Sequence, residues 1–225
     1  MTETPDGFTE LDRCKCVALS TDSAKQLQSR AAIFDDLRFV LRTCDLLIRH
    51  FRGEVLPELL GSDGDAPLVE ALWTAILIAY ERCFSTGQRK SLQYSDLTCV
   101  DPSGNALKLH KHYEGMRNRH PAHSVNPFAQ LQVVAVLSSA SSRRRDVEGI
   151  RTLSLRHIAA TEEEVVQLRV LVLQLLQHVA NECNSLAKEK VLQEARDLDV
   201  EELYSQEEAY LRVPGPGEVW TSRGQ

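Results

Sequence analysis

The hydrophobic residues of the first quarter of the chain recur with the period of an α-helix. From Phe34 to Phe51, a series of apolar side chains falls at spacings of three and four positions. This pattern predicts an amphipathic helix of roughly 28 residues that ends near Phe51. Its candidate N-cap residues, which carry a hydroxyl group just before the periodic segment, are Ser20, Thr21 and Ser23.

Two further helices are expected before the middle of the chain. Pro67 suits the first turn of a helix over 66–85, which is apolar on nearly every side and should lie at the centre of a bundle. The polar stretch 85–105 is interpreted as a connection. A third helix is expected over 103–119, and Pro121 prevents it from continuing unchanged, because proline removes a backbone hydrogen bond and clashes with the preceding turn.

The hydrophobic period changes after the third helix. Two segments lie on either side of a polar tip: the first is rich in β-forming residues, and the second alternates leucine with polar residues. Together they predict a β-hairpin of about 130–157. Thr161 and Glu164 then have the spacing of a capping box, and the apolar period returns. We expect a long final helix that begins there and ends near residue 195.

The sequence therefore predicts a mainly α fold: four long helices in a bundle, with a β-hairpin inserted between the third and the fourth. Its length fits one domain, assigned to 21–195. Residues 1–20 are expected to form an irregular N-terminal arm. The segment 196–225 is acidic and then rich in proline and glycine, and we expect it to be flexible.

Composition adds a charge asymmetry to this outline. The formal net charge is −6, which argues against an obligate polyanion binder. Seven Lys/Arg face three Asp/Glu between residues 82 and 120, whereas four face twelve between residues 161 and 210. A basic working surface on an acidic protein is expected. Scattered cysteines, the lack of a signal-peptide pattern and the lack of an apolar run of about 18 residues predict a cytoplasmic protein without a membrane segment.

The stretch "RNRHPAH", from Arg117 to His123, concentrates groups that could act on a phosphodiester. Arg117 offers a permanently charged fork that matches a phosphate, and His123 can give or take a proton near neutral pH. Asn118 could orient either group or contact the phosphate. On a continuous helix Arg117 and His123 would point apart, so the break at Pro121 is what would let them converge.

This stretch resembles the R-(four to six residues)-H motif of the HEPN superfamily, including the polar residue that follows the arginine. The resemblance implies a metal-independent endoribonuclease without a cofactor that cleaves single-stranded RNA by attack of its 2′-hydroxyl. It assigns catalytic roles to Arg117, Asn118 and His123. It also implies a homodimer in which two motifs share one RNA, a role as a toxin or in phage defence, and a possible antitoxin or regulatory protein as partner.

Other basic and aromatic residues are candidates for the same surface or for the core. Tyr113 and Trp73 are expected to be packing residues. His110 and His112 lie two positions apart on a helix, so they cannot both ligate one ion from that element, and no metal site is expected; both histidines are interpreted as solvated. The candidate RNA-binding residues are Arg89, Lys90, Lys108, Lys111, Arg119 and His120.

Two alternatives remain open at this point. The same cleft could belong to a non-catalytic, HEPN-like dimeric module that binds a nucleotide, a nucleic acid or a partner protein. The protein could also be a purely structural dimer built on its first and last helices, in which case the motif would carry neither binding nor cleavage.

Overall fold

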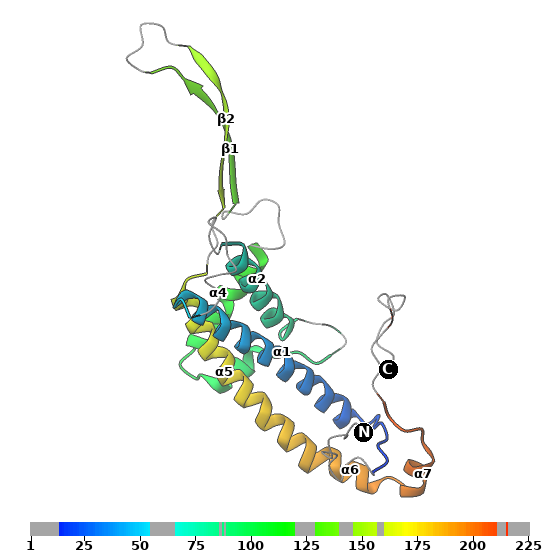
Figure 1. The fold of residues 1–225 in the computed structure, drawn as a ribbon. Coiled ribbons are helices and arrows are strands. Elements are labelled where there is room, and N and C mark those ends of the chain that lie inside the picture. The colour runs from blue at the N-terminus through cyan, green and yellow to red at the C-terminus, as the bar shows by residue number, and fades with distance from the viewer. Residues whose placement is uncertain are drawn as a thin grey trace, which may run out of the picture. The chain divides into compact units, whose positions relative to one another are not determined.

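The computed structural model is mainly helical and carries a small antiparallel β-hairpin (Figure 1). It describes residues 14–54, 66–85, 87, 89–119, 129–139, 146–156, 160–210 and 215. The chain divides into two compact units, one comprising residues 26–184 and the other comprising residues 1–25 together with 185–225. The predicted combination of a mainly α chain with a hairpin is confirmed.

The first two long helices begin close to where the periodicity places them. Helix α1 spans Asp22–Phe51, and the hydroxyl oxygen of Thr21 accepts a hydrogen bond of 3.2 Å from the backbone N–H of Ala24. This bond satisfies one of the backbone donors that a helix start leaves unpaired. Helix α2 spans Ala66–Arg82, slightly shorter than the 66–85 expected from the sequence.

A short helix, α3 (Tyr94–Val100), lies in the stretch interpreted as a polar connection. The Asp96 carboxylate accepts a 2.7 Å hydrogen bond from the backbone N–H of Gln93, which caps the start of the helix, and Leu97 is fully buried. Asp101 then accepts the backbone N–H of Ala106 at 2.9 Å. This contact joins the end of α3 to the first turn of α4 (Asn105–Arg119).

The second half of the chain follows the predicted order. Strands β1 (Ala129–Leu137) and β2 (Val147–Arg156) pair in antiparallel fashion, with a register shift between Val136 and Leu137. Helix α5 spans Glu162–Ser185. Its capping box is present: the backbone N–H of Thr161 bonds to the Glu164 carboxylate at 3.1 Å, and the backbone N–H of Glu164 bonds to the Thr161 hydroxyl at 3.2 Å.

One hydrophobic core serves α1, α2, α4 and α5. Aromatic side chains join α2 to α4 at its centre, where the rings of Trp73 and Tyr113 meet edge to face at 6.1 Å. The Tyr113 hydroxyl donates to the backbone oxygen of Glu164 at 2.9 Å, which connects this core to the start of α5. Trp73 and Tyr113 are completely buried, as the sequence predicted for packing residues.

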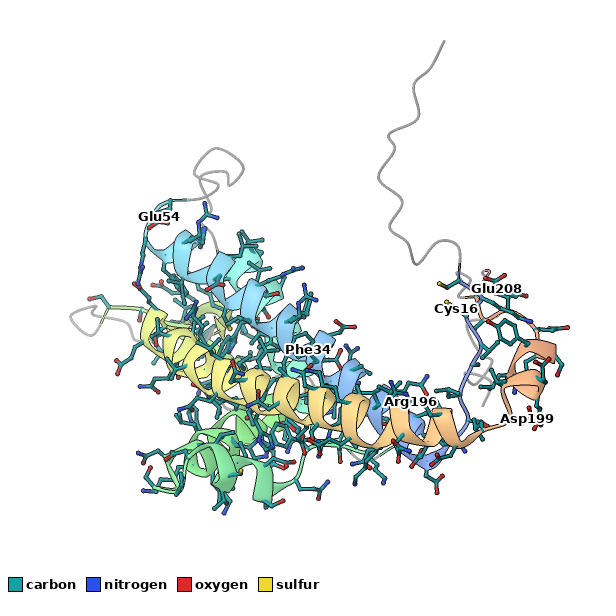
Figure 2. The ribbon with its side chains drawn as sticks, turned by 90° about the horizontal axis from the view of Figure 1, so that it is seen from below. Cys16, Phe34, Glu54, Arg196, Asp199 and Glu208 are labelled. Carbon is teal, nitrogen blue, oxygen red and sulfur yellow. The ribbon has the colours of Figure 1, made fainter. Side chains whose placement is uncertain are left out.

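The second unit is built around the chain's terminal segments. A π-helical turn, η2 (Leu186–Val191), follows α5, and then come α6 (Leu192–Asp197) and α7 (Val200–Ser205). Asp199 caps α7, which lies in the segment expected to be flexible. Figure 2 shows Cys16 beside Glu208, where the backbone N–H of Ala209 bonds to the Cys16 carbonyl at 2.8 Å. No helix in the described ranges combines the length and apolarity needed to cross a bilayer.

Truncation of the central aromatic residue of α2 should destabilise the fold. We expect Trp73→Ala to lower the free energy of unfolding by about 3–5 kcal/mol, because it leaves a large cavity in a rigid core. Ile78→Ala is the matched control on the same helix, since Ile78 is 46% exposed, and it should cost less than about 1 kcal/mol. Chemical denaturation of both variants measures the difference, and equal losses would contradict this account of the core.

Candidate functional site

A cavity of about 680 Å³ lies where the end of α2, the start of α3 and the second half of α4 meet. Helix α4 contributes His110, Glu114, Arg117 and Asn118, whose spacing places them on one face of a helix. The other helices contribute residues that include Glu81, Gln93 and Tyr94. The cavity size suits a ligand as large as a nucleotide, and its walls carry both charged and aromatic groups.

The first two residues of the HEPN-like motif lie together in this cavity. Arg117 donates a hydrogen bond of 2.9 Å from Nη1 to the side-chain oxygen of Asn118. Arg117 is half-buried and Asn118 is exposed. The amide therefore holds the guanidinium while using only one of its five N–H donors, and the remaining donors can contact an anion.

Glu81 is the residue of the cavity that sequence reasoning missed. It is only 7% exposed, and its Oε1 atom has no hydrogen-bond partner among the described residues. Burial, followed by repulsion from Glu114, raises the pKa of the Glu81 carboxyl to about 7, and the Arg117 charge opposes this rise. A carboxyl that gains and loses its proton near neutral pH is suited to acid–base chemistry.

His110 is buried beneath the cavity, so its interpretation as a solvated histidine is wrong. It is 1% exposed, its Nδ1 atom lies 3.1 Å from the Tyr80 hydroxyl, and its ring packs against Phe84 at 4.2 Å. Burial lowers the pKa of His110, which favours the neutral ring. His112, two positions further along α4, is exposed and lies 3.6 Å from Glu164, so the two histidines do face different ways.

Tyr94 gives the cavity an exposed aromatic surface. Its ring meets that of His110 edge to face at 5.5 Å, and about half of its surface is open to solvent. A tyrosine in this position can stack on a nucleobase while it stays anchored to the buried histidine. Tyr113, the aromatic residue one turn beyond His110 on α4, is fully buried in the core and has no such surface.

The remaining predicted RNA contacts are not gathered at the cavity. The Arg89 guanidinium bonds to the Asp36 carboxylate at 2.7 Å and to the backbone oxygen of Arg82 at 2.8 Å, so it already has two acceptors. Lys90, Lys108 and Lys111 are exposed, and none of them lines the cavity among the described residues. Arg119 ends α4, but its side chain, like the whole of His120 and His123, lies outside the described residues.

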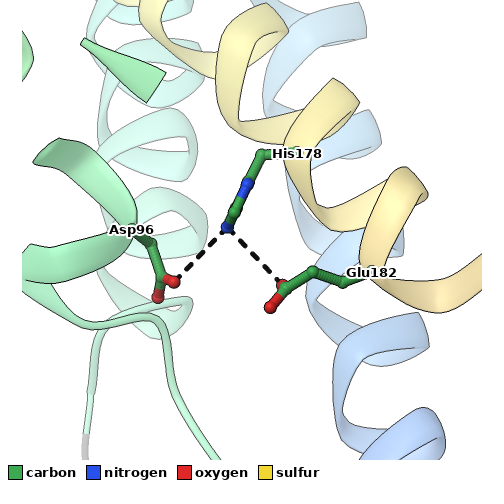
Figure 3. Close-up of side chains that lie close together, drawn as sticks. All are labelled: Asp96, His178 and Glu182. Atoms are coloured by element: carbon green, nitrogen blue, oxygen red, sulfur yellow. Dashed lines mark hydrogen bonds and ion pairs between the residues drawn. The ribbon is translucent and has the colours of Figure 1, made fainter. Parts of the chain in front are cut away.

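A second polar cluster joins α1, α3 and α5, and Figure 3 shows three of its side chains pointing toward one another. The Nε2 atom of His178 lies 3.4 Å from an oxygen of Asp96 and 3.7 Å from one of Glu182. These three groups could together face a metal ion. However, the Arg30 guanidinium lies 3.2 Å from Glu182 and 3.9 Å from Asp96.

The Arg30 charge decides how this second cluster is interpreted. A divalent cation between the carboxylates would lie beside a guanidinium that cannot lose its proton, and the two positive charges would repel at short range. The same arginine already neutralises part of the carboxylate charge. We therefore interpret the cluster as an ion-pair network that holds α3 against α1 and α5, with Asp96 also capping α3.

Comparisons with protein-family models, with curated proteins and with solved structures returned no match to this chain. The HEPN resemblance therefore rests on the motif beginning at Arg117 and on its position at the end of α4. Any conclusion about function therefore has to be drawn from the residues that line the cavity and from their geometry.

Glu81→Gln should change how stability depends on pH. In the wild type the folded carboxyl keeps its proton up to about pH 7, whereas the unfolded carboxyl loses it near 4.5. The free energy of unfolding therefore falls as the pH rises between these values, and glutamine removes this loss. Above pH 7 the variant should be more stable by up to roughly 3 kcal/mol, with the advantage vanishing near pH 4.5.

Denaturant unfolding at several pH values measures this difference, and exposed Glu207 provides the control. Glu207→Gln should follow the wild-type pH dependence throughout. Parallel wild-type and Glu81→Gln curves from pH 4.5 to 8 would show that the Glu81 carboxyl titrates normally.

Proposed function

We propose that the protein is a HEPN-like endoribonuclease that cleaves single-stranded RNA without a metal ion. The observation that carries this proposal is the shared cavity of Arg117, Asn118 and Glu81, which combines an anion-binding fork with a carboxyl that titrates near neutral pH. The common core of α1, α2, α4 and α5 supports the expected four-helix arrangement, with the motif at the end of its third long helix.

Arg117 binds the scissile phosphate in this proposal. Its guanidinium keeps N–H donors that can form a bidentate contact to two phosphate oxygens, and Asn118 fixes its orientation through the 2.9 Å hydrogen bond. In the transition state the phosphorus carries five oxygens and additional negative charge. A permanent positive charge held in place before the reaction stabilises that state more than the ground state.

Two proton transfers complete the reaction. A base removes the proton of the 2′-hydroxyl, the 2′-oxygen forms a bond to phosphorus, and the bond from phosphorus to the 5′-oxygen breaks. An acid protonates the departing 5′-oxygen, which leaves a 2′,3′-cyclic phosphate and a 5′-hydroxyl. We assign the acid to Glu81, whose pKa of about 7 keeps a large protonated fraction at neutral pH, and the base to His123.

The protonation state of Glu81 also governs whether an anion can enter the cavity. With both Glu81 and Glu114 ionised, two negative charges would oppose the phosphate and only Arg117 would attract it. Protonation of Glu81 removes one of these repulsions. The proposal therefore requires the protonated form both for substrate binding and for the chemical step.

The wider parts of the proposal come from the HEPN resemblance. They are a homodimer in which two motifs share one RNA, a role as a toxin or in phage defence, an antitoxin or regulatory protein as partner, and a cytoplasmic location. Tyr94 adds a surface on which a base next to the scissile phosphate can stack.

Incubation of the purified protein with a fluorescent single-stranded RNA in the presence of a chelator tests the reaction. We expect cleavage with a cyclic phosphate on the new 3′ end, and a rate that falls as the pH rises above 7. Arg117→Ala, Glu81→Gln and His123→Ala should each lower the rate at least about 100-fold, as expected for loss of charge stabilisation or proton transfer.

Arg42→Ala is the matched control, because Arg42 is an exposed arginine on α1 outside the cavity, and it should cleave RNA like the wild type. Equal cleavage by the wild type and the three cavity variants would reject the proposal. RNA binding that is lost in Arg117→Ala, with no cleavage by any form, would instead support the non-catalytic module.

A further inference from the structure

Both faces of the β-hairpin carry apolar residues, Leu153 among those of the second face, but most of the strongly exposed ones lie on one face. In an antiparallel pair, residues directly opposite each other lie on the same face. The register pairs Val133 with Thr152, Ala135 with Ile150 and Leu137 with Val147, so these six residues share a face, together with Leu131 further along β1. The neighbouring positions Gln132 and Arg151 lie on the other face.

The apolar face carries large side chains that remain in contact with water. Leu131 and Ile150 are 73% and 75% exposed, and Val133, Leu137 and Val147 are each more than half exposed. Thr152 is the polar residue among them, and charged Glu148 falls at the register shift, outside the paired positions. We call the set Leu131, Val133, Ala135, Leu137, Val147, Ile150 and Thr152 the hairpin face.

A two-stranded ribbon with an exposed apolar face requires another surface to cover that face. A two-stranded hairpin is at best marginally stable in water unless a hydrophobic face is covered, and a contiguous exposed apolar surface marks an interaction site. Its two outer edges also present unpaired backbone groups. Within the part of the chain that the structure describes, the helices do not supply the cover, since their core cluster contains no hairpin residue and the face stays exposed.

We propose that the hairpin face packs against the hairpin face of a second copy of this chain. The five large side chains expose roughly 600 Å² on one copy, so two copies together would bury about 1,200 Å², which reaches the size of a specific interface. The seven residues of the hairpin face carry no charge, and Arg156, which pairs with Ala129 on the same side, lies at the end of the ribbon. Two identical faces can therefore meet without burying a charge.

The cross-strand pairs also make the face complementary to itself. Ile150 is a large side chain opposite Ala135, a small one, so the pair forms a projection beside a hollow. A two-fold axis along the ribbon exchanges the two strands, so Ile150 of each copy lies over Ala135 of the other. The same operation places Val133 over Thr152 and Leu137 over Val147. Two identical patches related by a two-fold axis form a closed dimer, with the sheets packed about 10 Å apart.

Sedimentation velocity of the full chain over a range of concentrations tests this inference, which does not depend on the proposed ribonuclease activity. We expect the wild type to dimerise and Val133→Asp or Ile150→Asp to weaken the dimer at least about tenfold, because each places a carboxylate between two apolar faces. Gln132→Asp is the matched control: it adds the same charge one residue away, on the opposite face, and should leave the dimer unchanged.

Far-ultraviolet circular dichroism of each variant checks that the helical unit is intact, as expected because the altered residues lie outside its core. A wild type that stays monomeric at 100 μM, on the order of the weakest specific dimers, would overturn the inference. A dimer that survives both Val133→Asp and Ile150→Asp would overturn it as well, since the association would then use another surface.

Discussion

Aromatic packing between α2 and α4 determines where the polar residues of both helices lie. Trp73 and Tyr80 are seven positions apart on α2 and therefore share a face, and the Tyr113 ring meets both of them edge to face, at 6.1 and 6.2 Å. This contact fixes the rotation of α4 about its axis. His110, one turn before Tyr113, is then held by the Tyr80 hydroxyl at 3.1 Å. Glu114, Arg117 and Asn118, which follow His110 on the same face of α4, then line the cavity beside α3.

The rotation of α4 places its polar residues around the cavity, and the burial of Glu81 there costs free energy. Glu81 comes directly after Tyr80, so the packing that buries the tyrosine also draws the carboxyl out of water. An ionised carboxylate without a full set of partners is expensive in such surroundings, and the protonated form lowers the cost. Arg117 offsets part of it through its charge. A fold selected only for stability has little reason to keep this arrangement, which is why perturbed acids cluster at functional sites.

The sequence was sufficient to predict the long helices, because each of them has a signal within its own residues. Helices α1 and α5 were predicted because each places apolar residues at helical spacing over many turns. Helix α2 was predicted from its long apolar segment after Pro67, and α4 from the end that Pro121 imposes. Helix α3 was missed because it is seven residues long, too short for a periodic signal. Its stability comes from tertiary contacts of Asp96 with Arg30 and His178, which lie far away in the chain.

The candidate site likewise combines residues that the local sequence identifies with one whose properties depend on distant residues. Arg117 and Asn118 are adjacent in sequence, so a motif could find both. Glu81 is one of two acids, with Glu70, in an otherwise apolar helix, a composition that could have marked it as unusual. Its pKa, however, depends on Glu114 and Arg117, which only folding brings close. Arg89 was assigned to RNA as one of the basic residues near the motif in sequence. Its partner Asp36 is on α1, and no local pattern could have revealed that contact.

For the hairpin, the sequence pattern predicts the strands but not the surface that covers them. A β-rich segment and an alternating one correctly predicted two strands, and the pairing register determines which of their side chains share a face. In the helical unit, an apolar face identified in this way is covered by another helix of the same chain. In the hairpin the face that includes Val133 and Ile150 stays exposed. In the proposed dimer, the burial that stabilises this ribbon comes from association, so a mutation there can alter assembly while the helical core keeps its contacts.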